Sequence, residues 1–431
     1  MDFIKKILKS QLFKISSLNS VSVLIKIGIG LITSKVIALF VGPAGMALVG
    51  NMRNFMTSIE SIATLGLNGG IIKTVAENKD DSGKLNKILS TVFIAFLSVA
   101  IILSILLFLF SEYFNHKIFG ENHQYAFVFK ALAVAIPFYT LSMFLLSVIN
   151  GLGRFKNVIY INIIGNVIGL LVSLLLITRF QTLGALLAIV ITPSLLFLVT
   201  WFFINKEISI LRIIRTNKFD FLVIKDLSSY SLMAFFSGIF GSFIYLSIRN
   251  NLINTVGLQE AGYWESITRI STYYLMFVTT LIGVYYLPKL TTCKTTEETS
   301  TLFWDYFKRI LPLFILGVTV IYFLRFFILE TLFTKEFIPV ENLFFWQLLG
   351  DIFKVASFIL GYQFIARKMT TAFILSEVFS LSLMFCSSFY LVSLFGVKGV
   401  VMAHFFTYSI YFVILTFYFR KTIFNYNFPR L

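Results

Sequence analysis

The chain has 431 residues, of which 58% are hydrophobic, 17% are aromatic and only 13% are charged. A typical soluble domain is about 25% charged, and a soluble fold of this length could not hide 51 Phe behind so few ionisable groups. The composition therefore excludes a soluble domain and indicates an all-α polytopic membrane protein. The two cysteines, Cys293 and Cys386, have no metal-binding or redox spacing, so we expect neither a metal site nor a cofactor.

Hydropathy predicts twelve transmembrane helices, because about 20 apolar residues cross a bilayer. The predicted spans are residues 17–41, 45–68, 89–111, 125–149, 158–178, 183–204, 229–250, 263–287, 309–329, 342–366, 371–393 and 399–419. The basic N-terminal segment has no small-residue cleavage site after its apolar run, so we expect it to be retained. An even number of spans places both termini on the same side of the membrane.

Basic residues are divided unequally between the two sets of predicted loops. The loops on the side of the termini hold 24 of the 36 Lys and Arg. The opposite loops hold four, namely Lys117, Arg179, Lys335 and Lys398. By the positive-inside rule, both termini are cytoplasmic. Most of the net charge of +16 thus reflects topology and contact with anionic membrane lipids, and no basic soluble module indicates nucleic-acid binding.

Short sequence similarities recur at nearly equal separations, each close to half of the chain length. Ala44-Gly45 recurs as Ala261-Gly262, Arg154 as Arg367, and Gly184 as Gly399. We interpret these as two six-helix lobes, residues 1–205 and 229–431, joined by a basic cytoplasmic segment at 206–228. Lobes of six helices would be parallel repeats around a central cavity, with the substrate site near the membrane midplane. Chance similarity between apolar helices is the alternative.

Eight basic and four acidic residues fall inside the predicted spans. They are Lys26, Lys35, Arg53, Lys130, Arg249, Arg269, Arg325 and Lys354, with Glu60, Glu265, Asp351 and Glu377. Each costs about 2.5–3.5 kcal/mol at a helix centre on the insertion scale, so these groups should face water or one another. Helical spacing supports this, because Arg53 and Glu60 share one face of the second span and Glu265 and Arg269 are one helical turn apart.

Two interpretations of these charges remain open. Pairs such as Glu265 with Arg269, or Asp351 with Lys354, could simply neutralise buried charge. The excess of positive charge instead favours a wet cavity that attracts a phosphate- or carboxylate-bearing substrate. The residues predicted to bind substrate are Lys26, Lys35, Arg53, Glu60, Arg249, Glu265, Arg269, Asp351 and Lys354. For His404, in the last span, polar packing is favoured over a role as a proton relay.

Catalytic motifs are missing from the sequence. It contains no GxSxG, HExxH or GxxxxGK[ST] pattern, and its predicted loops are too short to build the site of a lipid-linked-sugar enzyme. We therefore expect a transporter that is not an enzyme.

Four segments carry a resemblance to a known family. They are LIKIGIGLITSKVIALFVGPAGMALVGNMRNF (24–55), GLQEAGYW (257–264), YYLPKL (285–290) and FWQLLGDIFKVASFILGYQFIARK (345–368). Together they resemble the Wzx-type flippases of the multidrug/oligosaccharidyl-lipid/polysaccharide (MOP) exporter superfamily, most closely the enterobacterial common antigen (lipid III) and O-antigen flippases. The resemblance covers nearly the whole chain and implies twelve helices in two six-helix lobes around a central cavity.

The resemblance also implies a function. It implies translocation of an undecaprenyl-pyrophosphate-linked oligosaccharide from the cytoplasmic to the periplasmic leaflet of a bacterial inner membrane by alternating access. Coupling to H⁺ or Na⁺ would then use Asp351 and Glu377, and polysaccharide polymerase and chain-length regulator proteins are the candidate protein partners. The alternatives are a multidrug or metabolite exporter of the same superfamily and a flippase for capsule or exopolysaccharide units.

Overall fold

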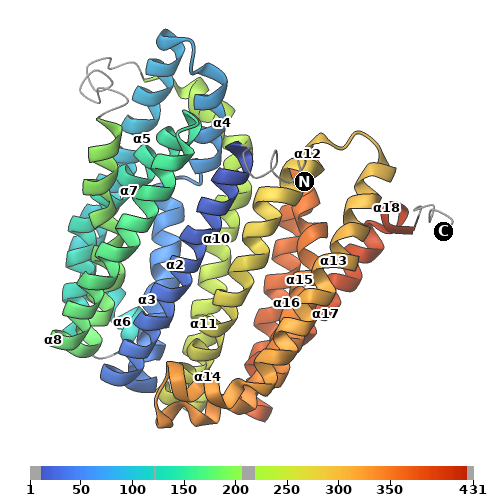
Figure 1. The fold of residues 1–431 in the computed structure, drawn as a ribbon. Helices are drawn as coiled ribbons and strands as arrows, with labels where there is room; N and C mark the ends of the chain where they lie inside the picture. The colour runs from blue at the N-terminus through green and yellow to red at the C-terminus, as the bar shows by residue number, and fades with distance from the viewer. Residues whose placement is uncertain (1–10, 121–122, 206–218, 425–431) are drawn as a thin grey trace. The chain divides into compact units, whose positions relative to one another are not determined.

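The structure is a computed structural model that describes residues 11–120, 123–205 and 219–424. These residues are almost entirely helical, and none of them forms a β-strand (Figure 1), which confirms the predicted all-α fold class. The helices are α2 (Gln11–Phe40), α3 (Gly42–Ala63), α4 (Asn68–Asn78), α5 (Ser82–Leu109), α6 (Ser111–Phe119), η1 (His123–Tyr125), α7 (Ala126–Gly151), α8 (Phe155–Ile204), α10 (Phe221–Val256), α11 (Leu258–Leu281), η2 (Ile282–Tyr286), α12 (Leu287–Thr292), α13 (Thr296–Phe323), α14 (Arg325–Leu332), η3 (Lys335–Val340), α15 (Glu341–Ala366), α16 (Thr370–Phe395), α17 (Val397–Tyr418) and α18 (Arg420–Phe424).

Ten helical stretches among the described residues are long and apolar enough to cross a membrane. One of them, α8, has 50 residues and carries two predicted spans, one on each side of Gln181, where the backbone is not helical. Another predicted span lies on the 22-residue α3, whose polar residues keep it out of the ten. Each of the twelve predicted spans therefore falls mainly on one of these helices, and the protein is a multi-pass membrane protein.

The chain folds into two compact units. Unit 1 contains residues 1–41 and 48–243, and unit 2 contains residues 42–47 and 244–431. The dividing line crosses α3 and α10. Most of the basic segment predicted to join two lobes lies at 206–218, outside the described residues, so the lobe boundaries at 205 and 229 stay a prediction.

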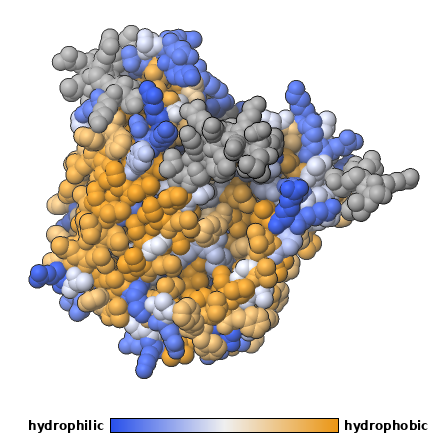
Figure 2. Space-filling view, viewed as in Figure 1, coloured by the Kyte–Doolittle hydropathy of each residue, from blue (hydrophilic) through white to orange (hydrophobic). Residues whose placement is uncertain are grey.

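In unit 1, α7 packs against both α5 and α8, and α8 packs against α2. The core between α5 and α7 includes the fully buried Phe96 and Phe144. By contrast, Leu171 and Leu175 of α8 leave more than half of their surface exposed. Figure 2 shows apolar side chains covering the visible flank of these helices, with hydrophilic residues gathered at helix ends. This distribution is expected of helices whose outer surface faces lipid.

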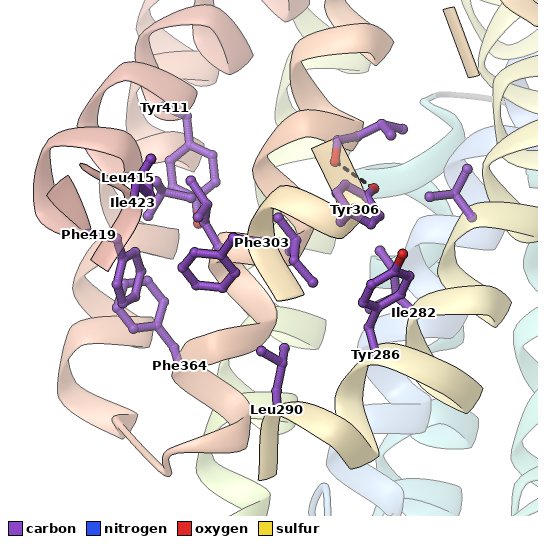
Figure 3. Close-up of a cluster of buried hydrophobic side chains, with 14 of the residues drawn as sticks. Ile282, Tyr286, Leu290, Phe303, Tyr306, Phe364, Tyr411, Leu415, Phe419 and Ile423 are labelled. Carbon is purple, nitrogen blue, oxygen red and sulfur yellow. Dashed lines mark hydrogen bonds between the residues drawn. The ribbon is translucent and has the colours of Figure 1, made fainter. Parts of the chain in front are cut away.

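In unit 2, α15 packs against α11, α13 and α17, and α17 also packs against α16. Figure 3 shows part of this core, which includes Phe303, Tyr306 and Phe364. The Tyr306 hydroxyl donates a hydrogen bond to the Val355 carbonyl oxygen (2.9 Å), so this phenol is buried without losing its polar partner. The core fixes α15 against α11 and α17, and these three helices carry the polar cluster described below.

Residues at which the backbone has a positive φ angle recur in pairs at one fixed separation along the chain. Positive φ angles occur at Gly42 and Gly257, at Gly153 and Lys368, and at Gln181 and Gly396. The members of all three pairs are equally far apart, and we call this common separation the repeat length. It also relates Gly184 to Gly399, and each of these glycines lies against the carbonyl of a residue on the other side of the helix break, Leu176 or Leu391. Both units therefore contain a tight helical hairpin made in the same way, in agreement with the repeat predicted from the sequence.

A capping residue begins α5. The Asp81 carboxylate accepts hydrogen bonds from the backbone N–H groups of Gly83 (3.1 Å) and Lys84 (3.0 Å). The hydrogen bond from Lys84 is the main cause that holds the pKa of Asp81 below its usual value. Asp81 thus satisfies two of the helix N-terminal donors that have no partner within the helix.

The start of α10 is attached to α5 within unit 1. The Asp220 carboxylate lies 2.5 Å from the Lys87 ammonium, and the Asp220 N–H donates to the Thr91 hydroxyl (3.1 Å). The hydrogen-bonded ion pair with Lys87 holds the pKa of Asp220 below its usual value. Asp220, just before α10, is therefore held against α5.

Gly399→Ala tests the hairpin between α16 and α17. Its Cβ would press on the backbone carbonyl of Leu391, which cannot swing aside as a side chain can. We expect a loss of about 1–3 kcal/mol of stability, measured as a lower thermal unfolding temperature in detergent. Gly361→Ala in α15 is the matched control, because a Cβ there meets nothing within 4 Å. Equal unfolding temperatures of the two variants would contradict the close approach.

Candidate substrate and ion-coupling sites

In unit 1, α3 presents a polar face. Arg53 and Thr57 are exposed there, and the Thr57 hydroxyl donates to the Arg53 carbonyl oxygen (3.0 Å). Further along the same face, Glu60 accepts a hydrogen bond from Tyr139 of α7 and interacts electrostatically with Lys26 of α2. The positive charge of Lys26 thus acts on Glu60, and Arg53 is accessible on the same helix as Glu60.

Lys35 lies apart from Lys26. The two residues are nine positions apart on α2, which is about half a turn around the helix axis at 100° per residue. Lys35 is half-buried, whereas Lys26 is exposed. A straight α2 therefore presents the two lysines on opposite faces.

In unit 2, two arginines share one carboxylate. Glu265 Oε2 lies 2.7 Å from Arg249 Nη2, and Glu265 Oε1 lies 3.0 Å from Arg269 Nε. All three residues are buried, with relative exposures of 4% for Glu265 and 2% for each arginine. The Arg249 guanidinium also lies over the Trp264 ring, 4.9 Å from its centroid. The predicted ion pair between Glu265 and Arg269 is therefore present, but the trio keeps one surplus positive charge.

A second polar cluster lies between α11, α15 and α17. Asp351, which is fully buried, accepts hydrogen bonds on Oδ2 from the Ser271 hydroxyl (2.5 Å), the Tyr274 hydroxyl and the Gln347 amide (3.2 Å). Its Oδ1 lies 3.0 Å from His404 Nε2. Every one of these neighbours can donate a hydrogen bond, so the cluster stabilises an ionised carboxylate in the interior of unit 2.

The partner of Asp351 differs from the one considered from the sequence. The Lys354 ammonium lies over the Tyr408 ring, 5.0 Å from its centroid, whereas the Asp351 carboxylate is held by His404. Lys354 acts on Asp351 only as a nearby positive charge. His404 is buried and polar, as the favoured packing role requires, and its imidazole contacts the Asp351 carboxylate.

Glu377 of α16 lies outside this hydrogen-bonded cluster. It interacts electrostatically with Tyr245 and Tyr408, which are hydrogen-bonded to each other. Glu377 is half-buried, unlike Asp351. The two residues predicted to carry a coupling ion therefore stand in different surroundings.

Two of the basic residues assigned to spans lie near helix ends. Lys130 is exposed in the second turn of α7. Arg325 begins α14, outside the ten candidate spans, with its guanidinium over the rings of Tyr322 (4.4 Å) and Phe326 (4.5 Å). Both positions suit a long side chain that reaches toward a membrane interface.

Ser271 and Tyr274 are the site residues that sequence reasoning missed. Both are on α11, nearly one helical turn apart, on the helix that carries Glu265 and Arg269. This spacing places them on one face, which is the only local signal that could have found them. Among the described residues, no group of three or more His, Cys, Asp or Glu side chains could hold a metal ion.

The long apolar helices, the accessible polar face of α3 and the buried charged clusters define a polytopic membrane protein with ionisable groups inside its spanning helices. Solved structures share this fold over nearly the whole chain. A multidrug resistance MATE family transporter of the MOP superfamily matches in its inward-facing conformation, with a TM-score of 0.72 and 14% identity over 94% of this chain and 96% of that one. The outward-facing conformation of such a transporter matches with a TM-score of 0.70 and 16% identity over 97% of each chain.

The sequence comparison identifies the family. Residues 12–291 match the model of the polysaccharide biosynthesis protein family, so the chain belongs to that family. The chain is also 27% identical over 401 residues to the "Lipid III flippase" of Escherichia coli (strain K12), covering 93% of this chain and 96% of that protein. The protein of the same name from Shigella flexneri gives the same figures.

Glu265→Gln tests the charge balance of the arginine pair. The substitution leaves two buried guanidinium groups without a carboxylate, which should cost about 3–5 kcal/mol, seen as a lower thermal unfolding temperature. Glu260→Gln is the matched control, since Glu260 lies in the first turn of the same helix and is only half-buried. If both variants unfolded at the temperature of the wild type, Glu265 would not be needed to hold the arginines.

Proposed function

We propose that the protein is a flippase that moves an undecaprenyl-pyrophosphate-linked oligosaccharide from the cytoplasmic to the periplasmic leaflet of a bacterial inner membrane. The family match and the likeness to lipid III flippases along 93% of the chain support this function. The likeness to MATE transporters supports the fold that such movement requires. The substrate class is an O-antigen repeat unit or lipid III, and the protein acts as a transporter, not as an enzyme.

The observation that carries the proposal is the surplus of positive charge in the membrane-spanning helices. In unit 1, Lys26 and Arg53 are exposed and accompany one acidic residue, Glu60. In unit 2, Arg249 and Arg269 share Glu265. A cationic surface bordered by the low-dielectric interior of a protein or membrane attracts anions. A pyrophosphate joined to a polar glycan is such an anion. The polyprenyl tail can stay in lipid while the headgroup moves.

The residues proposed to act on the headgroup have different exposures. Lys26, Lys35, Arg53, Glu60 and Lys354 retain some accessible surface, so these side chains are the ones proposed to contact the headgroup directly. Arg249, Glu265 and Arg269 are buried, and we propose that they supply a field of positive charge beneath that surface. Asp351 and Glu377 are the two candidates for a site that couples transport to an ion, H⁺ or Na⁺.

The orientation follows from the distribution of basic residues. We propose that both termini are cytoplasmic, because the loops on their side hold 24 of the 36 Lys and Arg. Membrane lipids and the lipid-linked glycan are the expected partners, and polysaccharide polymerase and chain-length regulator proteins are the proposed protein partners. Nucleic acid is not an expected partner.

The second candidate function is export of a drug or metabolite, and the likeness in fold to multidrug transporters favours it. An exporter of cations would need surplus acid on its polar surfaces, which is opposite to the charges found. A flippase for capsule or exopolysaccharide units is a variant of the first proposal, with the same anionic headgroup.

Complementation tests the function. The protein is expressed in bacterial strains that lack the flippase for one known repeat unit, including one that lacks lipid III flippase. We expect surface polysaccharide to return in at least one strain and the lipid-linked precursor to stop accumulating. If precursor stays high in every strain while the protein is present in the membrane, the proposal is wrong.

Arg53→Ala tests the accessible cation. Losing one charged contact to a phosphate costs about 1.5–3 kcal/mol, so we expect transport to fall about 10- to 100-fold, with a normal amount of protein in the membrane. Arg53→Glu should be worse because it reverses the local field. Lys117→Ala on α6, an exposed cation in a predicted loop, is the control that should export normally. Full export by Arg53→Glu would contradict a cationic surface.

A further inference from the structure

Asp351 is an ionisable group in the least accessible part of unit 2. Its relative exposure is 0%, and that of His404 is 4%. The two are held together by backbone packing as well as by their contact, because α15 has a glycine, Gly350, where the His404 ring lies against it. A Cβ at this position would collide with the imidazole Cδ2. The fold is therefore shaped to bring this imidazole to this carboxylate.

The repeat shows that the fold itself does not require the cluster. The positions one repeat length before the four residues of the cluster hold apolar side chains. Ile136 corresponds to Asp351, Ile189 to His404, Leu132 to Gln347 and Met56 to Ser271. Three of these, Ile136, Leu132 and Met56, are buried in unit 1. An apolar core thus occupies the corresponding place in unit 1. Since burying a charged pair is no more stabilising than burying apolar side chains of similar volume, the polar cluster of unit 2 needs a reason other than stability.

The charged and titratable groups around the pair come from each helix packed on it. On α11 there is the Tyr274 hydroxyl, which donates to Asp351. On α15 there is Lys354, whose positive charge acts on both Asp351 and His404. On α17 there is Tyr408, which acts on Asp351 and is hydrogen-bonded to Tyr245 of α10. Glu377 of α16 acts on the two tyrosines. No second carboxylate contacts the pair among the described residues.

We propose that Asp351 and His404 form a proton-binding site, that the coupling ion of the flippase is H⁺, and that His404 is the group that gains and loses the proton. This inference rests on the proposed function for its role in transport, whereas the site itself rests on the geometry of unit 2.

Asp351 stays ionised in both states, because Ser271, Tyr274 and Gln347 all donate to it. With the proton bound, His404 is an imidazolium and the pair is neutral. When Nδ1 releases the proton, Nε2 keeps its hydrogen and goes on donating to Asp351 Oδ1. The pair then carries one negative charge, next to the positive charge of Lys354. Of the two candidates for ion coupling, only Asp351 belongs to this pair.

The geometry favours H⁺ over Na⁺. Hard metal cations take oxygen ligands from several groups. Here Asp351 Oδ1 faces the imidazole nitrogen of His404, and its Oδ2 faces the amide nitrogen of Gln347 in addition to two hydroxyl groups that donate to it. Hydrogen-bond donors therefore occupy the positions around the Asp351 carboxylate that a metal ion would need. A proton needs no such space.

The first experiment observes His404 directly. The chain has three histidines, so His116→Gln combined with His123→Gln leaves His404 as the only imidazole of the full-length protein. Nitrogen-15 histidine spectra in lipid nanodiscs should show one proton gained and lost between about pH 5 and 8, at Nδ1, while Nε2 remains protonated. Asp351→Asn in the same background should move the transition by at least about one pH unit, because it removes the charge that stabilises the imidazolium. An imidazole that keeps one protonation state throughout this range would overturn the proposal.

The second experiment measures coupling. Purified protein in liposomes is given an undecaprenyl-pyrophosphate-linked glycan that the cellular test has identified, with and without a pH gradient that is acid on the delivery side. The wild type and His116→Gln should move the lipid several-fold faster with the gradient, and equally in Na⁺ and K⁺ buffers. His404→Gln, which can still donate to Asp351, should lose the response to the gradient. An undiminished response of His404→Gln, or a strict need for Na⁺, would overturn the proposal.

The two experiments separate this inference from the function. If the wild type moves no lipid-linked glycan under any condition, the proposed function fails, and the histidine spectra alone then decide whether the proton site exists. If transport occurs but ignores the gradient, the function stands and the coupling role of His404 is wrong.

Discussion

The free-energy cost of placing charge in lipid governs this structure. Each ionisable group at the centre of a spanning helix must meet water or a partner, and the chain uses both solutions. On α3, Arg53 and Thr57 remain accessible along one helix face. On α11, Glu265 is buried and lies 2.7–3.0 Å from its two arginine partners. On α15, Asp351 is buried and lies 2.5–3.2 Å from Ser271, His404 and Gln347. The accessible cations suit the proposed anionic headgroup, whereas the buried groups are held by hydrogen bonds and ion pairs.

The two units use one backbone scheme for different chemistry. Breaks at Gly42 and Gly257, and at Gln181 and Gly396, are separated by the same repeat length, so the helical hairpins are built alike. Side chains at corresponding places differ, since Ile136 stands where unit 2 has Asp351. The repeated scaffold thus carries a buried cluster around Asp351 in unit 2, whereas the corresponding place in unit 1 is apolar and the polar residues of α3 lie elsewhere in that unit.

Much of the fold could be predicted because hydropathy and helical periodicity are local properties. All twelve spans fall mainly on helices, and the pair between Glu265 and Arg269 follows from their spacing of one helical turn. The contact between Asp351 and His404 could not be predicted in this way, because it joins residues 53 positions apart on different helices. For the same reason, spacing suggested Lys354 as the partner of Asp351, although tertiary packing supplies His404. The contact of Arg249 with Glu265 also depends on how α10 packs against α11.

If the polar face of α3 lies in water within the membrane span, thiol accessibility can measure it directly. In a full-length protein whose two cysteines are replaced by Ser, Thr57→Cys is compared with Leu171→Cys, an exposed apolar position on α8. We expect a hydrophilic thiol reagent to label the cysteine at position 57 at least about tenfold faster than the one at position 171, since thiolates form in water and not in lipid. Equal, slow labelling at both positions would instead place Arg53 and Glu60 against lipid, and the polar face of α3 would then not be the accessible surface proposed for the headgroup.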